Sequence, residues 1–415
     1  MKILLYSANF APEPVGIGKY SGEMAAWLAT QGHEVRVVAA PPYYPAWKLA
    51  KGYGWPLYRR EQWQGVDVWR APIWVPKGQG GLMRILHLAT FAASSLPVML
   101  WQILWRPDVV MTVAPAMVCA PAGWLVAKLS GAKSWMHVQD FEVDMALRMG
   151  LIKGVRLSRA IRAFESLLLR GFDVVSTISG SMGQHLLRKS VPQERTYLLI
   201  NWADVDHIRP LTRPSSYRAE LELGPEVKVA LFSGTLSAKQ GLMVIPDAAR
   251  LLAGRSDLLF LVCGDGVMHE AMAQAAQELP NLRLLPLQPL ERLNDLLGLA
   301  DVHLLPQCQD AEDLVLPSKL TGMLASGRPV IATCRLNTEI ANVVGECGLI
   351  VESGDSRALA GAIEQLADDP MLRQQMGKHA RLYAETHLAS EAVLARMANK
   401  LETLVYGHTL HASQY

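Results

Sequence analysis

VALFSGT, residues 229–235, decides the fold, because this short apolar run ends in Ser233-Gly234 and leads into the helical pattern of 242–252. The chain opens in the same way, with KILLYS at 2–7, a glycine-bearing loop at 9–18 and an amphipathic helical pattern. A strand that ends in glycines and leads into a helix directs backbone N–H groups, and a partial positive charge, toward an anion. Two such segments, one at the start of each half, predict two facing nucleotide-binding-type domains with a cleft between them.

Length and composition agree with two folded domains. A chain of 415 residues exceeds one ordinary core, and 50% hydrophobic with 19% charged residues is typical of a globular protein. The start of the sequence has no apolar segment followed by a cleavage site, so we expect no secretion. The five cysteines have no C-x-x-C or histidine-paired spacing, which favours buried, reduced thiols over disulfides or metal ligands.

Charge and tryptophan divide the chain unequally. Residues 1–204 carry 22 Lys+Arg against 13 Asp+Glu (+9), and the rest carries 40 − 22 = 18 against 38 − 13 = 25 (−7). All eleven tryptophans lie between Trp27 and Trp202. A basic, aromatic first half suggests that it faces an anionic membrane surface. We expect no nucleic-acid partner, and the sequence leaves the oligomeric state open.

Short β-rich runs alternate with helical stretches, which predicts the α/β class with two doubly wound parallel sheets. The polar, proline-bearing segment 201–214 is the linker, and the chain after Asp355 is helical. We predict domains at 1–204 and 205–385 and a C-terminal helical segment at 386–415. The predicted strands are 2–7, 34–40, 66–71, 108–114, 133–138 and 174–179 in the first half, and 228–234, 258–263, 281–286, 301–306, 329–333 and 349–352 in the second.

One uncharged stretch, Ile85–Trp105, is long enough to span a membrane and is flanked by Arg84 and Arg106. It also contains histidine, serine, threonine, proline and glutamine, and it joins two strands that should share a sheet. A right-handed crossover needs its helix packed on that sheet, so we favour a packed or interfacial helix and keep a spanning helix as the alternative. The preceding loop, 47–63, alternates aromatic and cationic residues, as in a membrane interface; a solvated loop is the alternative.

Several motifs together resemble the retaining glycosyltransferases of family 4. The opening motif is Pro12-Glu13, then Gly16-Ile17-Gly18-x-Tyr20, then Gly32-His33-Glu34-Val35, and the closing motif is Pro317-Ser318-Lys319-Leu320 running into ASGRPVIA at 325–332. Within that family the stretches GIGKYxGEM, APPYYP, AKLSGA and VLPSKLT are similar to the colanic acid fucosyltransferases of bacterial exopolysaccharide assembly. The resemblance covers essentially the whole chain.

The resemblance implies a GT-B fold of two Rossmann-like domains. The N-terminal one would bind the acceptor and the C-terminal one the nucleotide sugar, with a GDP-sugar such as GDP-fucose favoured. The sequence alone leaves the base and the sugar of the donor open. The final helix, expected within residues 390–405, would cross back to the first domain. It further implies transfer to a lipid-diphosphate-linked saccharide, with no metal cofactor, by a cytoplasmic enzyme peripheral to the inner face of the plasma membrane.

The expected donor site lies mainly in the second half, and Gly16 and Gly18 of the first half would let the backbone approach the donor phosphate or the acceptor. A lysine near a helix N-terminus stabilises the charge that develops on departing phosphates, so Lys319 is the first candidate and Lys239 the second. The other donor-binding candidates are Gly16, Gly18, Ser233, Gly234, Thr235, Gly264, Gly266, Gln288, Asp313, Pro317 and Ser318. The family commonly has Arg where this chain has Thr235, Lys where it has Gln240, and glutamates where it has Leu314 and Gly322. Asp313 is the candidate to replace the first glutamate, and nothing obvious replaces the second.

The expected acceptor site lies in the first half. His137, from HVQD at the end of a predicted strand, corresponds to a family histidine near the reacting sugar and is the third catalytic candidate. Tyr20, Asp140 and Glu142 are the acceptor-binding candidates. Asp204-x-Asp206 resembles a metal motif, but its place in the linker favours a turn.

Two other functions remain open at this point. A sugar-nucleotide 2-epimerase has the same double-Rossmann build, although it needs no membrane face. A non-catalytic subunit that binds a sugar nucleotide would explain the two missing glutamates.

Overall fold

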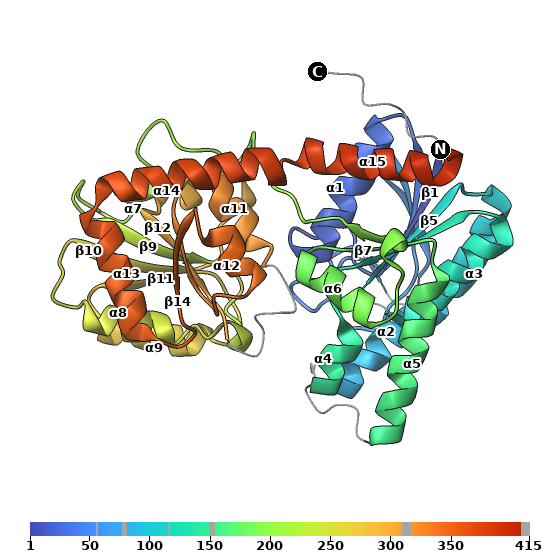
Figure 1. Ribbon diagram of the computed structural model, residues 1–415, viewed down its shortest axis with the longest axis horizontal. Helices are drawn as coiled ribbons and strands as arrows, with labels where there is room; N and C mark the ends of the chain where they lie inside the picture. Colours follow the sequence, from blue (N-terminus) through green and yellow to red (C-terminus); the bar gives the residue numbers. More distant parts are fainter. Residues whose placement is uncertain (55–56, 77–80, 115–116, 149–153, 309–316, 408–415) are drawn as a thin grey trace. The chain divides into compact units, whose positions relative to one another are not determined.

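The computed structural model describes residues 1–54, 57–76, 81–114, 117–148, 154–308 and 317–407. The chain forms two compact units (Figure 1). Unit 1 comprises Met1–Ile200 with Leu394–Tyr415, and unit 2 comprises Asn201–Val393. The division thus lies at Ile200/Asn201, whereas the sequence suggested a boundary after residue 204.

Unit 1 contains an eight-stranded sheet in the order β3-β4-β2-β1-β5-β6-β7-β8. Every neighbouring pair is parallel except β3 and β4. The strands are β1 Lys2–Ser7, β2 Glu34–Ala39, β3 Arg59–Trp63, β4 Val66–Arg70, β5 Val109–Ala114, β6 Lys133–Val138, β7 Val174–Thr177 and β8 Thr196–Leu198. Its helices are α1 Gly16–Thr30, α2 Gly81–Gln102, α3 Ala120–Ser130, α4 Glu142–Arg148, α5 Val155–Gly171 and α6 Gly180–Arg188.

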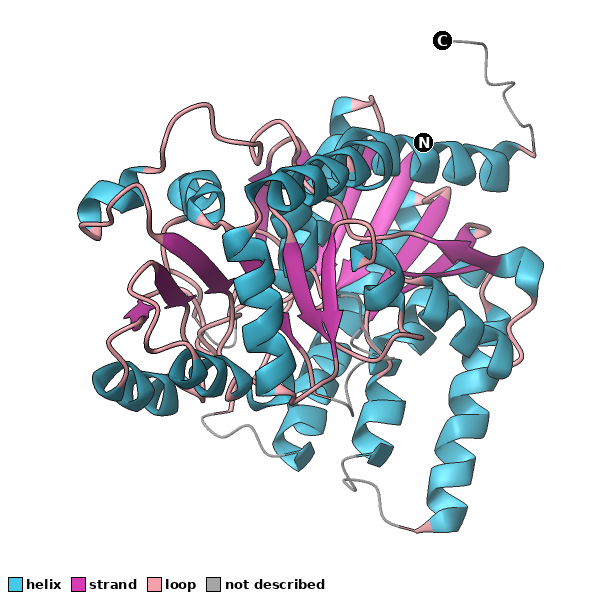
Figure 2. Cartoon of the chain, turned by 60° about the vertical axis from the view of Figure 1, so that its left-hand side comes forward, coloured by secondary structure: helices cyan, strands magenta, loops and turns pink. Residues whose placement is uncertain are grey.

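Unit 2 contains a six-stranded, wholly parallel sheet in the order β11-β10-β9-β12-β13-β14. Its strands are β9 Lys228–Ser233, β10 Leu258–Cys263, β11 Leu282–Leu285, β12 Val302–Pro306, β13 Val330–Thr333 and β14 Gly348–Val351. The helices are α7 Ser216–Glu220, α8 Val244–Leu251, α9 His269–Glu278, α10 Leu293–Leu299, α11 Lys319–Ala325, α12 Glu339–Val344, α13 Ser356–Asp368 and α14 Pro370–Tyr383. Figure 2 shows the strands of the chain flanked by helices, which explains why β10 is buried at all six positions.

The predicted α/β class with two doubly wound sheets is confirmed, and so are all the predicted strands. Two strands of unit 1 were missed. β3 is a polar edge strand, joined to β4 by a two-residue turn in which Gln64 and Gly65 both have positive φ (43° and 83°), as tight hairpins require. β8 is only three residues long. Neither strand has the apolar run that is typical of a buried parallel strand.

Helix α2, with the short helix Ile103–Trp105, covers the uncharged stretch and packs one face on the first sheet. Phe91 and Met99 are fully buried in a cluster with Tyr6 of β1, whose hydroxyl lies 2.5 Å from Ser95 Oγ. The opposite face is exposed, and only 28% of the most apolar 18-residue stretch within Met83–Trp105 is buried. The segment has the length and composition of a membrane span, but its contacts are those of the crossover helix we favoured.

The linker and the C-terminal segment meet within unit 2. Asp204 accepts a hydrogen bond from the His207 amide (2.9 Å), so it forms a turn, as its position suggested. Ala203 pairs with the chain at Leu388 and Ser390 (2.7 and 3.0 Å). From there α15, Ser390–Tyr406, begins in unit 2 and continues, from Leu394, as part of unit 1.

Candidate active site

The strand order of unit 2 reverses between β9 and β12, and parallel α/β sheets bind ligands at the carboxyl ends of strands beside such a reversal. Backbone hydrogen bonds join the loop after β9 to the loop after β10. The Gly234 amide donates to Cys263 O (2.9 Å), and the Leu236 amide donates to Asp265 O (2.8 Å). Five predicted donor residues are therefore close together: Ser233, Gly234, Thr235, Gly264 and Gly266.

The glycine at 264 is required by this contact. A Cβ added there would lie 1.9 Å from Gly234 O, and one added at Gly266 would lie 2.5 Å from Leu236 O. Both positions also have φ near 150°, which L side chains rarely adopt. The two loops therefore form one compact ledge of backbone at the carboxyl ends of β9 and β10.

Lys319 is the first residue of α11 and extends over this ledge. Its Nζ lies 4.1 Å from the centre of the Phe232 ring in β9, and a Cβ at Gly234 would touch its side chain at 3.5 Å. Gln240, with its amide oriented so that the nitrogen donates to Thr235 O (2.7 Å), presents its oxygen 3.3 Å from Nζ. Burial lowers the pKa of Lys319 to about 7. Among the described residues no carboxylate forms an ion pair with this ammonium.

Two of the remaining donor-site candidates lie partly or wholly outside the described residues. Lys239 has its backbone in the short helix Ala238–Gln240, but its side chain is outside the described part of the chain, and Asp313 lies in the undescribed 309–316. The carbonyl of Pro317 accepts from the Leu320 amide (3.0 Å). Ser318 precedes α11 without capping it through its side chain.

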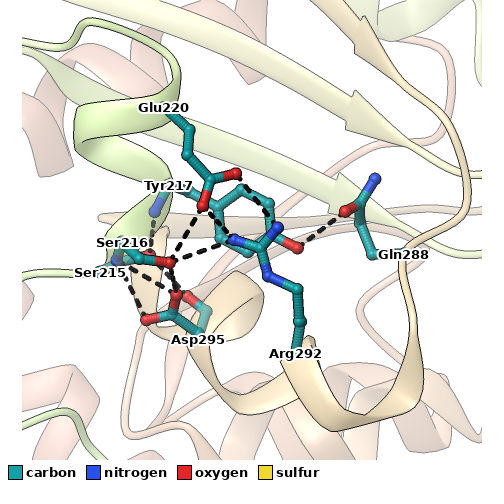
Figure 3. A network of polar contacts seen from close by, with 7 residues as sticks. All are labelled: Ser215, Ser216, Tyr217, Glu220, Gln288, Arg292 and Asp295. Carbon is teal, nitrogen blue, oxygen red and sulfur yellow. Dashed lines mark hydrogen bonds and ion pairs between the residues drawn. The ribbon is translucent and has the colours of Figure 1, made fainter.

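Gln288 belongs to a polar network on unit 2 (Figure 3). Its Oε1 accepts from the Tyr217 hydroxyl (2.9 Å) and its Nε2 donates to Pro286 O (2.8 Å). Arg292 stacks on the Tyr217 ring at 4.0 Å and pairs with Glu220. Because its side chain is engaged within the protein, Gln288 has mainly its backbone to offer a nucleotide.

In unit 1 the strand order reverses between β1 and β5, and the loops there are held by a buried carboxylate that belongs to the opening motif but had no role predicted from the sequence. Glu13 is 3% exposed. Its Oε1 accepts from the amides of Tyr43 and Tyr44 (3.0 Å each), and its Oε2 accepts from Asn9 Nδ2 (3.0 Å). Burial raises the pKa of Glu13, while these hydrogen bonds oppose that shift. One side chain thus joins the loop after β1 to the loop after β2.

The two predicted glycines of the first loop lie against this arrangement. A Cβ at Gly18 would be 2.4 Å from Glu13 Oε2, so no larger residue fits there. Gly16 begins α1 with φ 62° and its nearest neighbour is the ring of Tyr44, 3.6 Å from an added Cβ. Tyr20, further along α1, is 3% exposed, so it contributes mainly to the core rather than to an open surface.

His137 is the last but one residue of β6 and is 3% exposed. Its Nδ1 lies 2.8 Å from Ser176 Oγ of β7, and burial lowers its pKa to about 4. The imidazole is therefore neutral at pH 7, and any contact with a sugar must be made by the uncharged ring.

Asp140 and Glu142 follow β6 and lie near a cation that sequence analysis missed. Glu142 accepts from the Met117 amide (3.3 Å), and burial, assisted by Asp140, raises its pKa to about 7, against the attraction of Arg84 in α2. Arg84 and Asp140 also act on the pKa of Tyr44. No spacing in the sequence connects Arg84 with residues 140–142. A patch of two acids, one cation and a tyrosine can hydrogen-bond the hydroxyls of a saccharide.

Comparisons with known proteins agree with this construction. Residues 15–202 match the model of the glycosyl transferase 4-like domain, and residues 227–369 match that of the glycosyl transferases group 1. The chain therefore belongs to the GT-B glycosyltransferases of this family. It is 39% identical to the putative colanic acid biosynthesis glycosyl transferase WcaI of Escherichia coli strain K12, over 97% of this chain and 100% of that one.

Solved structures share the fold. Sucrose-phosphate synthase from Thermosynechococcus elongatus superposes with a TM-score of 0.75 at 17% identity, covering 98% of this chain and 100% of that one. Anabaena Alr3699/HepE in complex with UDP gives 0.70 at 16% identity, covering 97% and 100%. At these identities the likeness concerns the fold alone.

Proposed function

We propose that this glycosyltransferase moves a hexosyl unit, with retention of anomeric configuration, from a nucleotide diphosphate to a lipid-diphosphate-linked saccharide in exopolysaccharide assembly. The observation that carries the proposal is Lys319, a buried lysine at the reversal point of the unit 2 sheet, whose side chain lies against Phe232 and Gly234. Such a cation, beside a backbone ledge, suits the diphosphate of a donor. The name of the E. coli relative supports the exopolysaccharide pathway, and the resemblance in sequence favours GDP-fucose as donor.

The chemistry needs no nucleophile from the protein. The bond from the sugar C1 to the phosphate oxygen breaks, and its electron pair goes to the leaving diphosphate. The acceptor hydroxyl attacks C1 on the same face and gives its proton to that diphosphate. Lys319 would stabilise the charge as it grows on the phosphate, an interaction stronger in the transition state than in the ground state. His137, neutral and buried, would serve as a hydrogen-bonding partner of the sugar rather than as a general base. No step in this scheme is assigned to a metal.

Attachment of unit 1 to the inner face of the membrane is part of the proposal. The outer face of α2 exposes Ile85, Leu86, Leu100 and Trp101 by 39–61%. Helix α5 adds four apolar side chains exposed by 54–77% (Val155, Leu157, Phe164 and Leu167) and the exposed cations Arg156, Arg159 and Arg162. Apolar and basic side chains on one helix are typical of binding to an anionic bilayer surface.

The test begins with the donor. Thermal unfolding in the presence of GDP-, UDP-, dTDP- and ADP-sugars should single out one of them, because a bound ligand raises the unfolding temperature by mass action. That sugar nucleotide is then incubated with lipid-diphosphate saccharides, and NMR of the product reports its anomeric configuration. Transfer with retention, undiminished by a chelator, is expected.

Other results would contradict the proposal. An epimer formed without acceptor would indicate a 2-epimerase, although neither relative described above carries that name. Binding without turnover on any acceptor would indicate a non-catalytic subunit.

A further inference from the structure

A cavity of about 450 Å³, open to solvent, lies in unit 1, and none of the candidate donor or acceptor residues lines it. It is formed by the edge hairpin β3–β4 and the second half of α2. Its walls combine aromatic rings and guanidinium groups, among them Tyr58, Arg59, Arg60, Trp69, Pro97 and Trp101. These walls present cations and apolar rings to the same space.

Positive charge exceeds negative charge at this hairpin. Arg60 donates two hydrogen bonds to Asp67 (2.8 and 2.9 Å), and Arg36 pairs with the same carboxylate at 3.6 Å. Arg59 (3.3 Å) and the buried Arg70 (2.8 Å) both pair with Glu61. Within the hairpin three arginines thus face two carboxylates, and from outside it Glu34 acts on Arg36 and Glu13 on the buried Arg70. The side chains of Arg59 and Arg60 are 51% and 58% exposed, so an anion can reach both guanidinium groups from solvent.

The hairpin also fixes the orientation of Arg60. Its guanidinium lies 5.0 Å from the centre of the Trp69 ring, while Asp67 holds one edge of its fork. An arginine held in this way loses little conformational entropy when it binds an anion, and its planar fork suits a phosphate or carboxylate.

The cavity is continuous with an exposed apolar surface. Trp101, which lines it, is 61% exposed, and Leu100 and Leu104 beside it in sequence are 39% and 74% exposed. Inorganic phosphate would gain nothing from these side chains. An amphiphile with an anionic head and an apolar body would match both the exposed guanidinium groups and the apolar surface.

We propose that this cavity binds the phosphate headgroup of an anionic membrane phospholipid, whose acyl chains lie along the exposed face of α2. The inference rests on the membrane attachment in the proposed function, and it adds a discrete, saturable site to what would otherwise be general adsorption. Arg59 and Arg60 hold the phosphate, and Trp101 contacts the first part of the acyl chain.

The test uses the full-length protein and dihexanoyl-phosphatidylglycerol below its micelle concentration, titrated by calorimetry. Saturable one-to-one binding is expected, with much weaker binding of dihexanoyl-phosphatidylcholine and of inorganic phosphate. Arg60→Gln should weaken binding about fivefold, which corresponds to about 1 kcal/mol for one cation near an anionic head. Trp101→Ala should also weaken lipid binding, because it removes the apolar contact with the acyl chain. Arg250→Gln is the matched control, since Arg250 is 55% exposed and pairs with Asp247 at 3.0 Å in unit 2.

The outcomes separate this site from the wider proposal. If the parent sediments with anionic vesicles but Arg60→Gln and Trp101→Ala bind the short lipid like the parent, the cavity is not the site and general attachment stands. Equal affinity for inorganic phosphate and for the lipid would show an anion site and overturn the lipid assignment. A protein that binds neither short lipid nor anionic vesicles, yet transfers sugar to a soluble acceptor, would refute both the site and the attachment while the transferase proposal survives.

Discussion

The ammonium of Lys319 lies 4.1 Å above the centre of the Phe232 ring, which belongs to the strand that ends at the glycine ledge. A ring face attracts a cation without neutralising it. The Phe232 ring therefore holds the lysine at the carboxyl end of β9 without neutralising its charge. Burial at this place also makes the charge costly, which is why its pKa is lowered.

Lys319→Ala should lower kcat by roughly 10²-fold or more, because the interaction it removes grows as the phosphate leaves. Lys239→Ala should be harmful to a smaller extent. Steady-state kinetics together with thermal unfolding will separate this effect from misfolding, and Lys378→Ala on the exposed surface of α14 is the matched control. Activity within a few-fold of the parent would remove Lys319 from the catalytic set.

The affinity for nucleotide diphosphate should fall with rising pH above about 7. The ammonium of Lys319 has a pKa of about 7 without ligand, and a bound anion raises that value. Binding therefore takes up a proton, and the association constant should decrease by as much as about tenfold per pH unit above 7. Calorimetry between pH 6.5 and 9, in buffers of different ionisation enthalpy, measures both effects. Lys319→Arg should give a flatter profile, and a flat profile in the parent would contradict the assignment.

Gly18→Ala should destabilise unit 1 by roughly 1–3 kcal/mol, since the new methyl group meets Glu13 Oε2 at 2.4 Å. Chemical denaturation measures the change in the free energy of unfolding. The control is Gly361→Ala in α13, where no atom lies within 4 Å of the added Cβ; there we expect stabilisation of about 0.5–1 kcal/mol. If both variants behaved alike, the close contact between Gly18 and Glu13 would be wrong.

The protein should sediment with vesicles that contain anionic lipid and bind less to neutral ones. Replacing Lys51, Arg59 and Arg60 together by Glu should release it, while transfer to a short soluble acceptor is retained. High salt should weaken binding without abolishing it, because the Debye length shortens from about 8 Å at physiological salt whereas apolar contacts persist. Protein that only detergent extracts would instead indicate that residues 85–105 span the bilayer.

Much of the fold followed from apolar runs, because buried parallel strands need hydrophobic side chains on both faces. The polar strand β3 was not predicted, because an edge strand does not need hydrophobic side chains on both faces. At the site, the glycines of the sequence predicted the donor-binding loops around Gly234 and Gly264. The role of Glu13 did not follow, because its partners are amides of Tyr43 and Tyr44 that only the folded chain brings near. The burial of His137 likewise depends on neighbouring strands.

Helix α15 has a consequence for the order in which the protein can fold during synthesis. Met397 and Leu401 are fully buried, and they belong to unit 1 although they are made after all of unit 2. A nascent chain that has left the ribosome up to residue 393 holds a first unit with part of its apolar surface uncovered. Unit 2, in contrast, is a single continuous segment of chain. We therefore expect the second unit to reach its native state no later than the first, so that the portion synthesised earliest is completed last.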